Sequence, residues 1–358
     1  TSYMEMPNTD PPTTTLARLE KKFQSAAGRS YANFSFYLGG TNDNLQEIKA
    51  LDPRQSCGIK VFMGSSTGNL LVDDMDALAA IFARSPVIVA THCEDDTLID
   101  ANARRCREKY GEDVPMSEHP RIRSEESCYR STHRAVALAR EHGTHLHILH
   151  LTTARELSLL SDRPLDEKRI TAEVCVHHLF FDETAYATKG TLIKCNPAIK
   201  SPADRKALLQ AVADGMIDII ATDHAPHTLE EKQRSYFQAP SGLPLVQHAL
   251  VCLLEHYHAG RLSLPLIAEK TAHAPARLFQ LKDRGYIREG YWADLTLVDT
   301  HRPYRVDEHP LFARCGWTPF DDVTFRSTVD TTIVSGQLAF QNGRIESPPA
   351  GKRLDFRR

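Results

Sequence analysis

The chain lacks the patterns that mark several large classes of protein. None of its 8 cysteines are paired as Cys-x-x-Cys, which removes the usual zinc-ribbon and thioredoxin motifs. No apolar run reaches the length of a membrane helix, and no signal peptide is recognisable. The cysteines, some of them beside strand-like runs (Cys57 and Cys175), are expected to be reduced core residues. We therefore expect a cytoplasmic protein.

The chain also lacks a strong charge of either sign. It has 43 Lys and Arg residues against 46 Asp and Glu residues, which gives a net charge of -3, and it has no long run of one charge. Neither nucleic acid nor an anionic membrane is therefore indicated as a partner. At 358 residues the chain can bury a large core. A small-molecule substrate is the expected ligand, and a homodimer is compatible with the sequence.

Strand-like and helix-like runs alternate along most of the chain. The predicted strands are 3–7, 32–38, 58–63, 87–92, 145–150, 170–174 and 216–222. Between them, segments such as 75–84, 131–142 and 203–213 carry apolar residues at every third or fourth position, which predicts helices. Parallel strands alternating with helices close most readily into a (β/α)8 barrel, whose active sites lie at the carboxyl ends of the strands. One of the eight strands is missing. Since the sequence starts as if inside a strand, we expect the missing strand to be the first.

The pattern changes after Phe279 to short strand-like segments separated by turn residues. These segments are 285–290, 293–298, 323–334 and 338–340. We predict a barrel over residues 1–284 and a small β-sandwich unit over 285–358. The stretch 302–319, with its prolines and Trp317, is predicted to be a loop packed against the flank of the barrel.

Four predicted strands carry an ionisable residue within or directly after an otherwise apolar run. These residues are Lys60, His92, His150 and Asp223. Burying a carboxylate or an ammonium is costly unless a metal, a charged partner or a proton transfer makes use of it. Because the carboxyl ends of parallel strands meet at one end of a barrel, the four side chains are predicted to converge on a metal centre.

Each of these residues also has a simpler interpretation. A single His in a strand is usually a hydrogen-bonded core residue, and we expect that role for His147 and a polar-loop role for His224. Lys60 has two ways to avoid an unpaired charge: it can pair with a buried carboxylate, or it can lose its proton and react with carbon dioxide to give a carbamate able to bridge two metals. The sequence leaves both open. Cys93 and Glu94 are predicted to orient a metal ligand.

Six short motifs occur in the order seen in dihydroorotases of the cyclic amidohydrolase superfamily. They are Met6-Pro-Asn-Thr9, the strand around Lys60, Thr91-His-Cys-Glu-Asp95, His150-Leu-Thr-Thr153, Lys194-Cys-Asn-Pro197 and Thr222-Asp-His-Ala-Pro-His227. The segment 290–299 is similar to the strand by which that superfamily returns to its small β-sandwich. The chain therefore resembles this family over nearly its whole length.

The resemblance implies a (β/α)8 TIM barrel of the metal-dependent amidohydrolase type with a binuclear zinc centre. In the family, the zinc ions are held by an N-terminal His-x-His pair, a carbamylated Lys, two further His and an Asp. The last four would be Lys60, His92, His150 and Asp223 here, whereas the N-terminal pair is absent from this chain. We expect that pair to precede Thr1, rather than to have been lost in a paralogue.

The implied reaction is the reversible hydrolysis of (S)-dihydroorotate to N-carbamoyl-L-aspartate, a step of de novo pyrimidine biosynthesis. A zinc-bound hydroxide would attack the ring carbonyl and Asp223 would shuttle the proton. Asn8 and His227 would hold the substrate carboxylate, and Asn196 would contact the ring. Residues 241–244 would offer backbone groups to the ring edge or form a plain turn. The alternatives are a related cyclic amidohydrolase (a hydantoinase, dihydropyrimidinase or allantoinase) and a non-catalytic dihydroorotase-like subunit that stabilises a partner enzyme.

Overall fold

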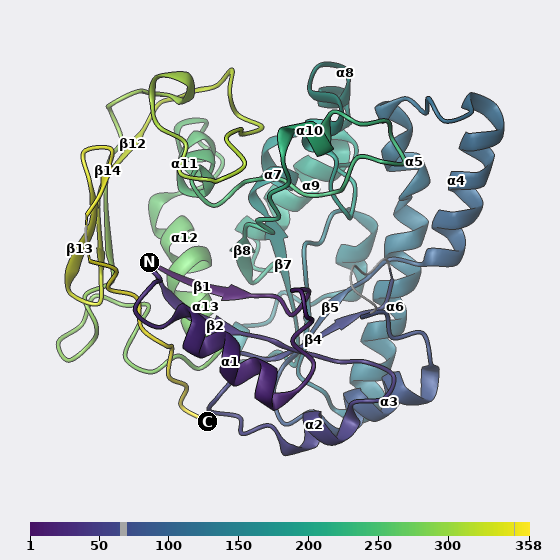
Figure 1. Cartoon of the computed structure of the whole chain (residues 1–358), viewed down its shortest axis with the longest axis horizontal. Coiled ribbons are helices and arrows are strands. Elements are labelled where there is room, and N and C mark those ends of the chain that lie inside the picture. The colour runs from purple at the N-terminus through teal and green to yellow at the C-terminus, as the bar shows by residue number, and fades with distance from the viewer. Residues whose placement is uncertain (65–69, 347) are drawn as a thin grey trace.

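A run of parallel strands forms the centre of the computed structural model, which describes residues 1–64, 70–346 and 348–358 (Figure 1). Strand β1 (Ser2–Glu5) pairs in parallel with β2 (Asn33–Phe36). A six-stranded parallel sheet then continues in the order β3-β4-β5-β6-β7-β8. Its strands are β3 (Leu38–Gly39), β4 (Ile59–Phe62), β5 (Val89–His92), β6 (Leu146–Ile148), β7 (Ile170–Cys175) and β8 (Ile219–Ala221).

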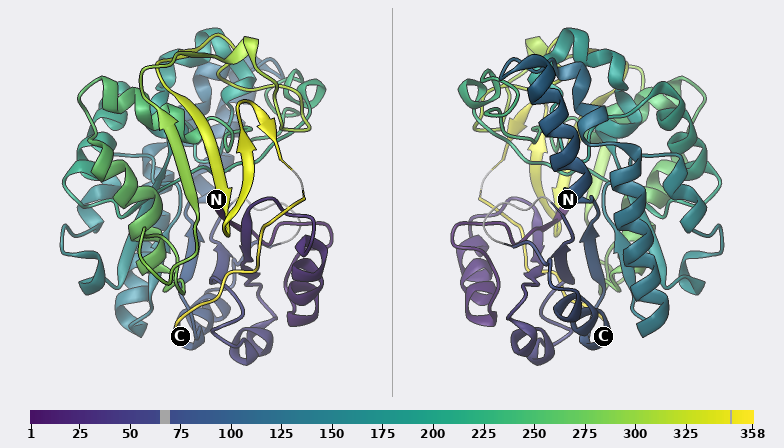
Figure 2. Two further views of the ribbon diagram at one scale, coloured as in Figure 1. Left: turned by 90° about the vertical axis from the view of Figure 1, so that its left-hand side faces the viewer. Right: turned by 90° about the vertical axis from the view of Figure 1, so that its right-hand side faces the viewer.

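Helices follow most of these strands and cover the outside of the sheet (Figures 1 and 2). The larger ones are α1 (Leu16–Ala26), α3 (Met75–Arg84), α4 (Asp96–Tyr110), α6 (Glu125–His142), α9 (Pro202–Ala213) and α11 (Ala249–His258). The shorter ones are α2 (Leu45–Ala50), α5 (His119–Ile122), α7 (Val176–Phe180), α8 (Tyr186–Lys189), α10 (Leu229–Lys232), α12 (Leu264–Ala268) and α13 (Ala274–Leu278).

Local sequence explains where the helices begin and which face they bury. The side chain of Asp74 accepts hydrogen bonds from the amides of Asp76 and Ala77 and so caps α3. Ser201 and Asp204 form a reciprocal capping box at the start of α9. In α3 the buried residues are Leu78, Ile81 and Phe82, whose spacing of three and one places them on one face toward the sheet.

The predicted alternation of parallel strands and helices, and with it the barrel architecture, is confirmed. Each of the seven predicted strands is present, although most are shorter than predicted, and 32–38 is divided into β2 and β3. The division arises because Tyr37 N donates to Glu5 O on one side while Leu38 N donates to Gly58 O on the other. The predicted helices are also present: 75–84 is α3, and α6 and α9 begin earlier than 131 and 203.

The C-terminal part forms a small antiparallel sheet on one side of the molecule, where the strands are yellow-green to yellow in Figure 2. Its order is β14 (Arg344–Ile345), β13 (Gln337–Gln341), β12 (Thr328–Val334) and β9 (Leu295–Asp299), and β10 (Tyr304–Arg305) pairs separately with β11 (Thr324–Phe325). The prediction of a strand over 285–290 is wrong, because Gly285 and Gly290 have φ angles of 84° and 80° and the segment forms bends and turns. The division into units at residue 284 stays a prediction.

The segment 302–319 does more than lie on the flank of the barrel. It includes β10, and its indole donor, Trp317 Nε1, bonds the carbonyl oxygen of His227 at 2.7 Å. The predicted loop therefore contacts a segment that carries a candidate site residue.

Two predictions on composition can be compared with the structure directly. Each of the eight cysteines is free, and Cys57 and Cys175 are buried, as predicted. In the parts of the chain that the structure describes, none of the helices has the length and apolar character that a membrane span requires.

Candidate metal centre

His92, the last residue of β5, is held in place by a buried carboxylate. Glu94 is fully buried, and its Oε2 lies 3.0 Å from His92 Nε2. The same oxygen accepts a hydrogen bond from Arg123 in a buried ion pair. Burial alone would raise the pKa of Glu94, but Arg123 and His92 outweigh it and lower the pKa to about 2. Glu94 is therefore an acceptor that fixes the proton of His92 on Nε2 and leaves Nδ1 with a lone pair.

His150, which lies just beyond the neighbouring strand β6, approaches this lone pair. Its Nε2 lies 3.0 Å from His92 Nδ1, and its own Nδ1 is buried with no hydrogen-bond partner in the described ranges 1–64, 70–346 and 348–358. Burial, with smaller contributions from His92 and Lys60, holds the pKa of His150 well below its usual range, so the ring is neutral. The residue lies two positions beyond the end of β6 and has a φ of 38°, so its backbone no longer follows the strand.

Lys60, in the middle of β4, is a buried amine with little compensation. Its side chain is 2% exposed; Nζ lies 3.4 Å from the carbonyl oxygen of Val61 and 3.9 Å from the centroid of the Phe62 ring. Among the residues that the structure describes, Lys60 forms no ion pair. Desolvation lowers its pKa to about 7, although the charges of Asp223 and other neighbouring groups act in the opposite direction. A large share of this amine is therefore neutral near pH 7.

Asp223 lies just beyond β8 and faces the same region. Desolvation, reinforced by the charge of Glu173, raises its pKa to about 6, while Lys60 acts to lower it. Its φ of 48° is unusual for a residue with a side chain. Strained backbone of this kind clusters at functional sites, and both Asp223 and His150 show it.

The donor set suits a divalent metal. Two imidazole nitrogens bound to one tetrahedral zinc at about 2.0–2.1 Å lie about 3.3 Å apart, close to the 3.0 Å between His92 Nδ1 and His150 Nε2. The Glu94 carboxylate contacts the other ring nitrogen of His92, as is common for a metal-bound His, and the buried amine of Lys60 lies near the two imidazoles.

The three predicted substrate residues lie in separate segments around this end of the sheet. Asn8 is exposed just beyond β1. Asn196 precedes a cis peptide bond to Pro197, and its Oδ1 is buried with no hydrogen-bond partner among the described residues. His227 Nε2 lies 3.2 Å from the carbonyl oxygen of Ser241.

Two buried lysines hold the chain beside Asn196 and His227. Lys232 donates to the carbonyl oxygens of Lys194, Pro240 and Gly242 at 2.9–3.1 Å. Lys194 donates to the backbone carbonyl oxygens of Tyr236 and Ala239. A cavity of about 570 Å³ lies next to this loop, lined by residues that include His224, His227 and Trp317. Within 241–244, Gly242 is thus held by Lys232 and Pro244 lines the cavity.

Several simpler expectations agree with the structure. His147 is buried and bonds Thr171 Oγ1 at 2.9 Å and Glu173 Oε2 at 3.1 Å, which is a structural role. His224 Nδ1 accepts the amide of Leu245 at 2.9 Å and so braces a loop. Cys93, however, bonds Thr91 Oγ1 rather than a metal-ligand candidate.

Three features of the site were not predicted from the sequence. Glu173 on β7 touches His147 and the amide of His150 and adds negative charge beside Lys60 and Asp223. Arg123 neutralises Glu94. The third is a cluster formed by Cys175, His177 and His178 at the end of β7. Side chains two positions apart on a strand lie on the same face, so Glu173 shares a face of β7 with Cys175, which ends the strand. This alternation could have indicated that Glu173 faces the site.

Replacing Glu94 by Gln is expected to destabilise the protein by about 3 kcal/mol, because it removes the carboxylate from a largely buried ion pair with Arg123. Since the pKa of Glu94 is lowered from 4.5 to about 2, its stabilisation is present above pH 4.5 and is lost as the pH falls toward 2. Chemical denaturation across this pH range measures both effects. Glu112→Gln is the matched control: it breaks the exposed pair with Arg107 and should change stability by less than about 1 kcal/mol. Equal losses in both variants would contradict the role given to Glu94.

Comparison with known proteins places this geometry in a family. Residues 60–339, more than three-quarters of the chain, match the Amidohydrolase family. The chain belongs to the amidohydrolase family. It is 31% identical to the dihydroorotase of Methanothermobacter thermautotrophicus over 347 residues, which cover 96% of this chain and 77% of that protein. It is 33% identical to the dihydroorotase of Halobacterium salinarum over 328 residues, which cover 90% of this chain and 74% of that protein.

A solved structure agrees with this placement. The L-hydantoinase of Arthrobacter aurescens has a TM-score of 0.91 at 25% identity, covering 99% of this amidohydrolase and 80% of that chain. The resemblance drawn from the sequence motifs is therefore confirmed. The protein is a hydrolase, and its family implies dependence on a metal and action on a small molecule.

Proposed function

We propose that this amidohydrolase is a dihydroorotase that interconverts (S)-dihydroorotate and N-carbamoyl-L-aspartate in the cytoplasm. The observation that carries the proposal is the approach of His92 to His150 at 3.0 Å, near the buried Lys60 and the half-buried Asp223. The dihydroorotases named above, at 31% and 33% identity over most of the chain, support this substrate over other cyclic amides.

Lys60, His92, His150 and Asp223 would hold the metal, with Lys60 as its carbamate in a binuclear zinc centre. The neutral fraction of a Lys60 amine with a pKa of about 7 is the form that reacts with carbon dioxide. Bound zinc would polarise the ring carbonyl of the substrate and lower the pKa of the attacking water. Glu94 fixes the orientation of the His92 ring through Nε2.

Asp223 would carry the proton between water and the ring nitrogen. Because its pKa is about 6, its carboxylate accepts a proton readily near neutral pH and its acid form releases it again. In the hydrolytic direction the proton passes from the attacking water to the departing nitrogen. In the direction of ring closure the same carboxylate takes the proton from that nitrogen.

Asn8 and His227 would hold the substrate carboxylate, and Asn196 would contact the ring. The buried Oδ1 of Asn196, which no described residue contacts by a hydrogen bond, is an acceptor suited to a ring N–H of dihydroorotate. The carbonyl oxygen of Ser241 contacts the imidazole of His227. In the same loop, Gly242 N donates to the carbonyl oxygen of Lys194 at 2.9 Å, two residues before Asn196. One loop therefore holds both His227 and the segment of Asn196.

Gly242→Ala is expected to raise the KM for dihydroorotate by about 10-fold or more, because a misplaced binding group loses well over 1 kcal/mol of binding. The glycine has a φ of 146°, and an added Cβ would lie 2.3 Å from Ala225 O and 3.1 Å from His227 Cδ2. Steady-state kinetics measures the change. Gly260→Ala is the control, with a φ of 68° and no atom within 4 Å of the added Cβ, and should cost stability without changing KM. A KM that is the same in both variants would argue against a binding role for this loop.

Turnover of a panel of cyclic amides tests the proposed function. Zinc-loaded protein is assayed with dihydroorotate, hydantoin, dihydrouracil and allantoin, and metal content is measured in the same sample. We expect dihydroorotate to be preferred by at least about 100-fold in kcat/KM, since the other three amides lack the carboxylate that Asn8 and His227 are proposed to hold. Faster turnover of another amide would reassign the substrate. A protein that holds no zinc and turns over none of the four would be the non-catalytic alternative.

A further inference from the structure

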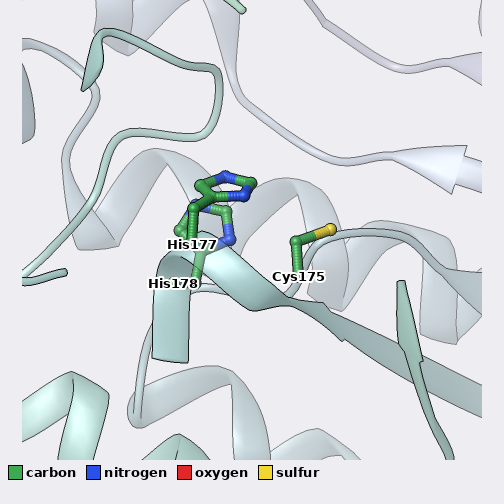
Figure 3. Close-up of side chains that lie close together, drawn as sticks. All are labelled: Cys175, His177 and His178. Carbon is green, nitrogen blue, oxygen red and sulfur yellow. The ribbon is translucent and has the colours of Figure 1, made fainter. Parts of the chain in front are cut away.

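Three side chains with metal-binding atoms gather where β7 ends and α7 begins (Figure 3). Cys175 is the last residue of β7, and His177 and His178 lie in the first turn of α7. Their ligand atoms lie within 4.8 Å of one another. Cys175 and His177 are fully buried and His178 is 3% exposed. Burial of three such groups together needs a physical reason.

Hydrogen bonding does not provide that reason. His178 Nε2 lies 3.1 Å from the carbonyl oxygen of Pro197, so its proton lies on Nε2 and Nδ1 carries a lone pair. This Nδ1 is buried, and in the part of the chain that the structure describes it has no partner. The same holds for both ring nitrogens of His177. A buried polar atom without a partner has lost its hydrogen bonds to water and gained none, so the cluster destabilises the fold as it stands.

We propose that Cys175, His177 and His178 bind a divalent transition-metal ion, with zinc as the best match, at a site distinct from the Lys60, His92, His150 and Asp223 set. One thiolate and two imidazoles are ligands that zinc prefers, and three protein ligands leave a fourth position for water. Binding requires the thiolate form, so the thiol proton of Cys175 leaves to solvent as the metal–sulfur bond forms. The Pro197 carbonyl orients His178 as a metal-bound His is usually oriented.

The site would connect three segments near the candidate active site. Strand β7 carries Cys175, helix α7 carries both His residues, and the bond from His178 reaches the carbonyl oxygen of Pro197 next to Asn196. An ion here would therefore fix the segment that holds Asn196. It would also lie near His150, whose pKa the two His residues help to lower. Its role would be to position the substrate segment rather than to take part in the reaction.

Cobalt substitution of the whole protein tests the proposal with a signal specific to this site. Co²⁺ bound to a thiolate gives a near-ultraviolet charge-transfer band, and the four residues proposed for the catalytic centre include no thiol. We expect this band in the wild-type protein and its loss in Cys175→Ala, together with the loss of about one metal ion per chain, as one site predicts. Absence of the band in the wild type, or its survival in Cys175→Ala, would overturn the proposal.

Two control variants separate this site from its surroundings. Cys195→Ala removes another buried thiol, whose Sγ lies 4.0 Å from His178 Nε2, on the protonated edge of that ring, and it should keep the band. Asp223→Asn should lose turnover but keep the band, so failure of the proposed function is distinguishable from failure of this site. If Cys175→Ala does not fold, His177→Asn with an intact fold provides the same test. A band lost in Cys195→Ala and retained in Cys175→Ala would show that the ligand assignment is wrong.

Discussion

Asp223→Asn is expected to lower the turnover number for dihydroorotate by about 10³-fold or more, because an amide cannot exchange the proton that the proposed reaction moves. The loss should appear in kcat in both directions of the reaction, since the same group serves hydrolysis and ring closure. Initial rates with dihydroorotate and with N-carbamoyl-aspartate measure it. A variant with near wild-type rates would exclude Asp223 as the proton carrier.

The same variant should be more stable than the wild type in the metal-free protein at pH 7. Burial raises the pKa of Asp223 from 3.8 to about 6, so its charged form destabilises the fold. The folded state holds the proton more tightly, and stability is therefore lost as the pH rises from about 4 through about 6. We expect Asp223→Asn to gain on the order of 2 kcal/mol at pH 7 and to lack this pH dependence.

Asp214→Asn is a suitable control for both measurements. Asp214 follows α9, is exposed and accepts a hydrogen bond from Gln210 at 2.8 Å. The control should change neither the rate nor the pH dependence of stability. Chelated samples of the three proteins, denatured over a range of pH, give the comparison. A metal-free Asp223→Asn variant that is less stable than the wild type would contradict a desolvated carboxylate.

The sequence predicted the strands well because buried parallel strands are almost continuously apolar. The same apolar runs drew attention to Lys60, His92, His150 and Asp223, which interrupt or follow them. That these four residues hold a metal stays a prediction. The sequence could not predict the local conformation of His150 and Asp223. The two residues lie just beyond β6 and β8 and have φ angles of 38° and 48°. The pattern of side chains in a sequence does not predict such left-handed backbone.

The supporting roles of Arg123 and Glu173 were harder to predict because their partners are distant in sequence. Glu94 and Arg123 are 29 positions apart, and His147 and Glu173 are 26 apart. Only the packing of the strands and helices brings such pairs together. At 285–290 the sequence was misleading, since two glycines that permit positive φ stand in a stretch that otherwise looks like a strand.

Lys60→Ala is expected to lower turnover by about 10³-fold and to weaken metal binding, because it removes the anionic ligand that a carbamate would provide. Lys60 is 2% exposed, and desolvation lowers its pKa to about 7. An unpaired ammonium in this position is costly, whereas a carbamate between metal ions is compensated. Metal content after dialysis and steady-state rates measure the two losses.

Rescue by small molecules distinguishes the two interpretations of Lys60. If the carbamate is the functional form, a short carboxylate such as acetate should enter the space left by Lys60→Ala and restore part of the activity and the metal content. If Lys60 instead serves as a cation, an alkylamine should restore function and acetate should not. Lys168→Ala is the control, since Lys168 is buried in an ion pair with Asp218 at 2.8 Å. Its loss should reduce stability by about 3 kcal/mol, and neither compound should restore activity selectively, because its charge supports the fold rather than a metal ion.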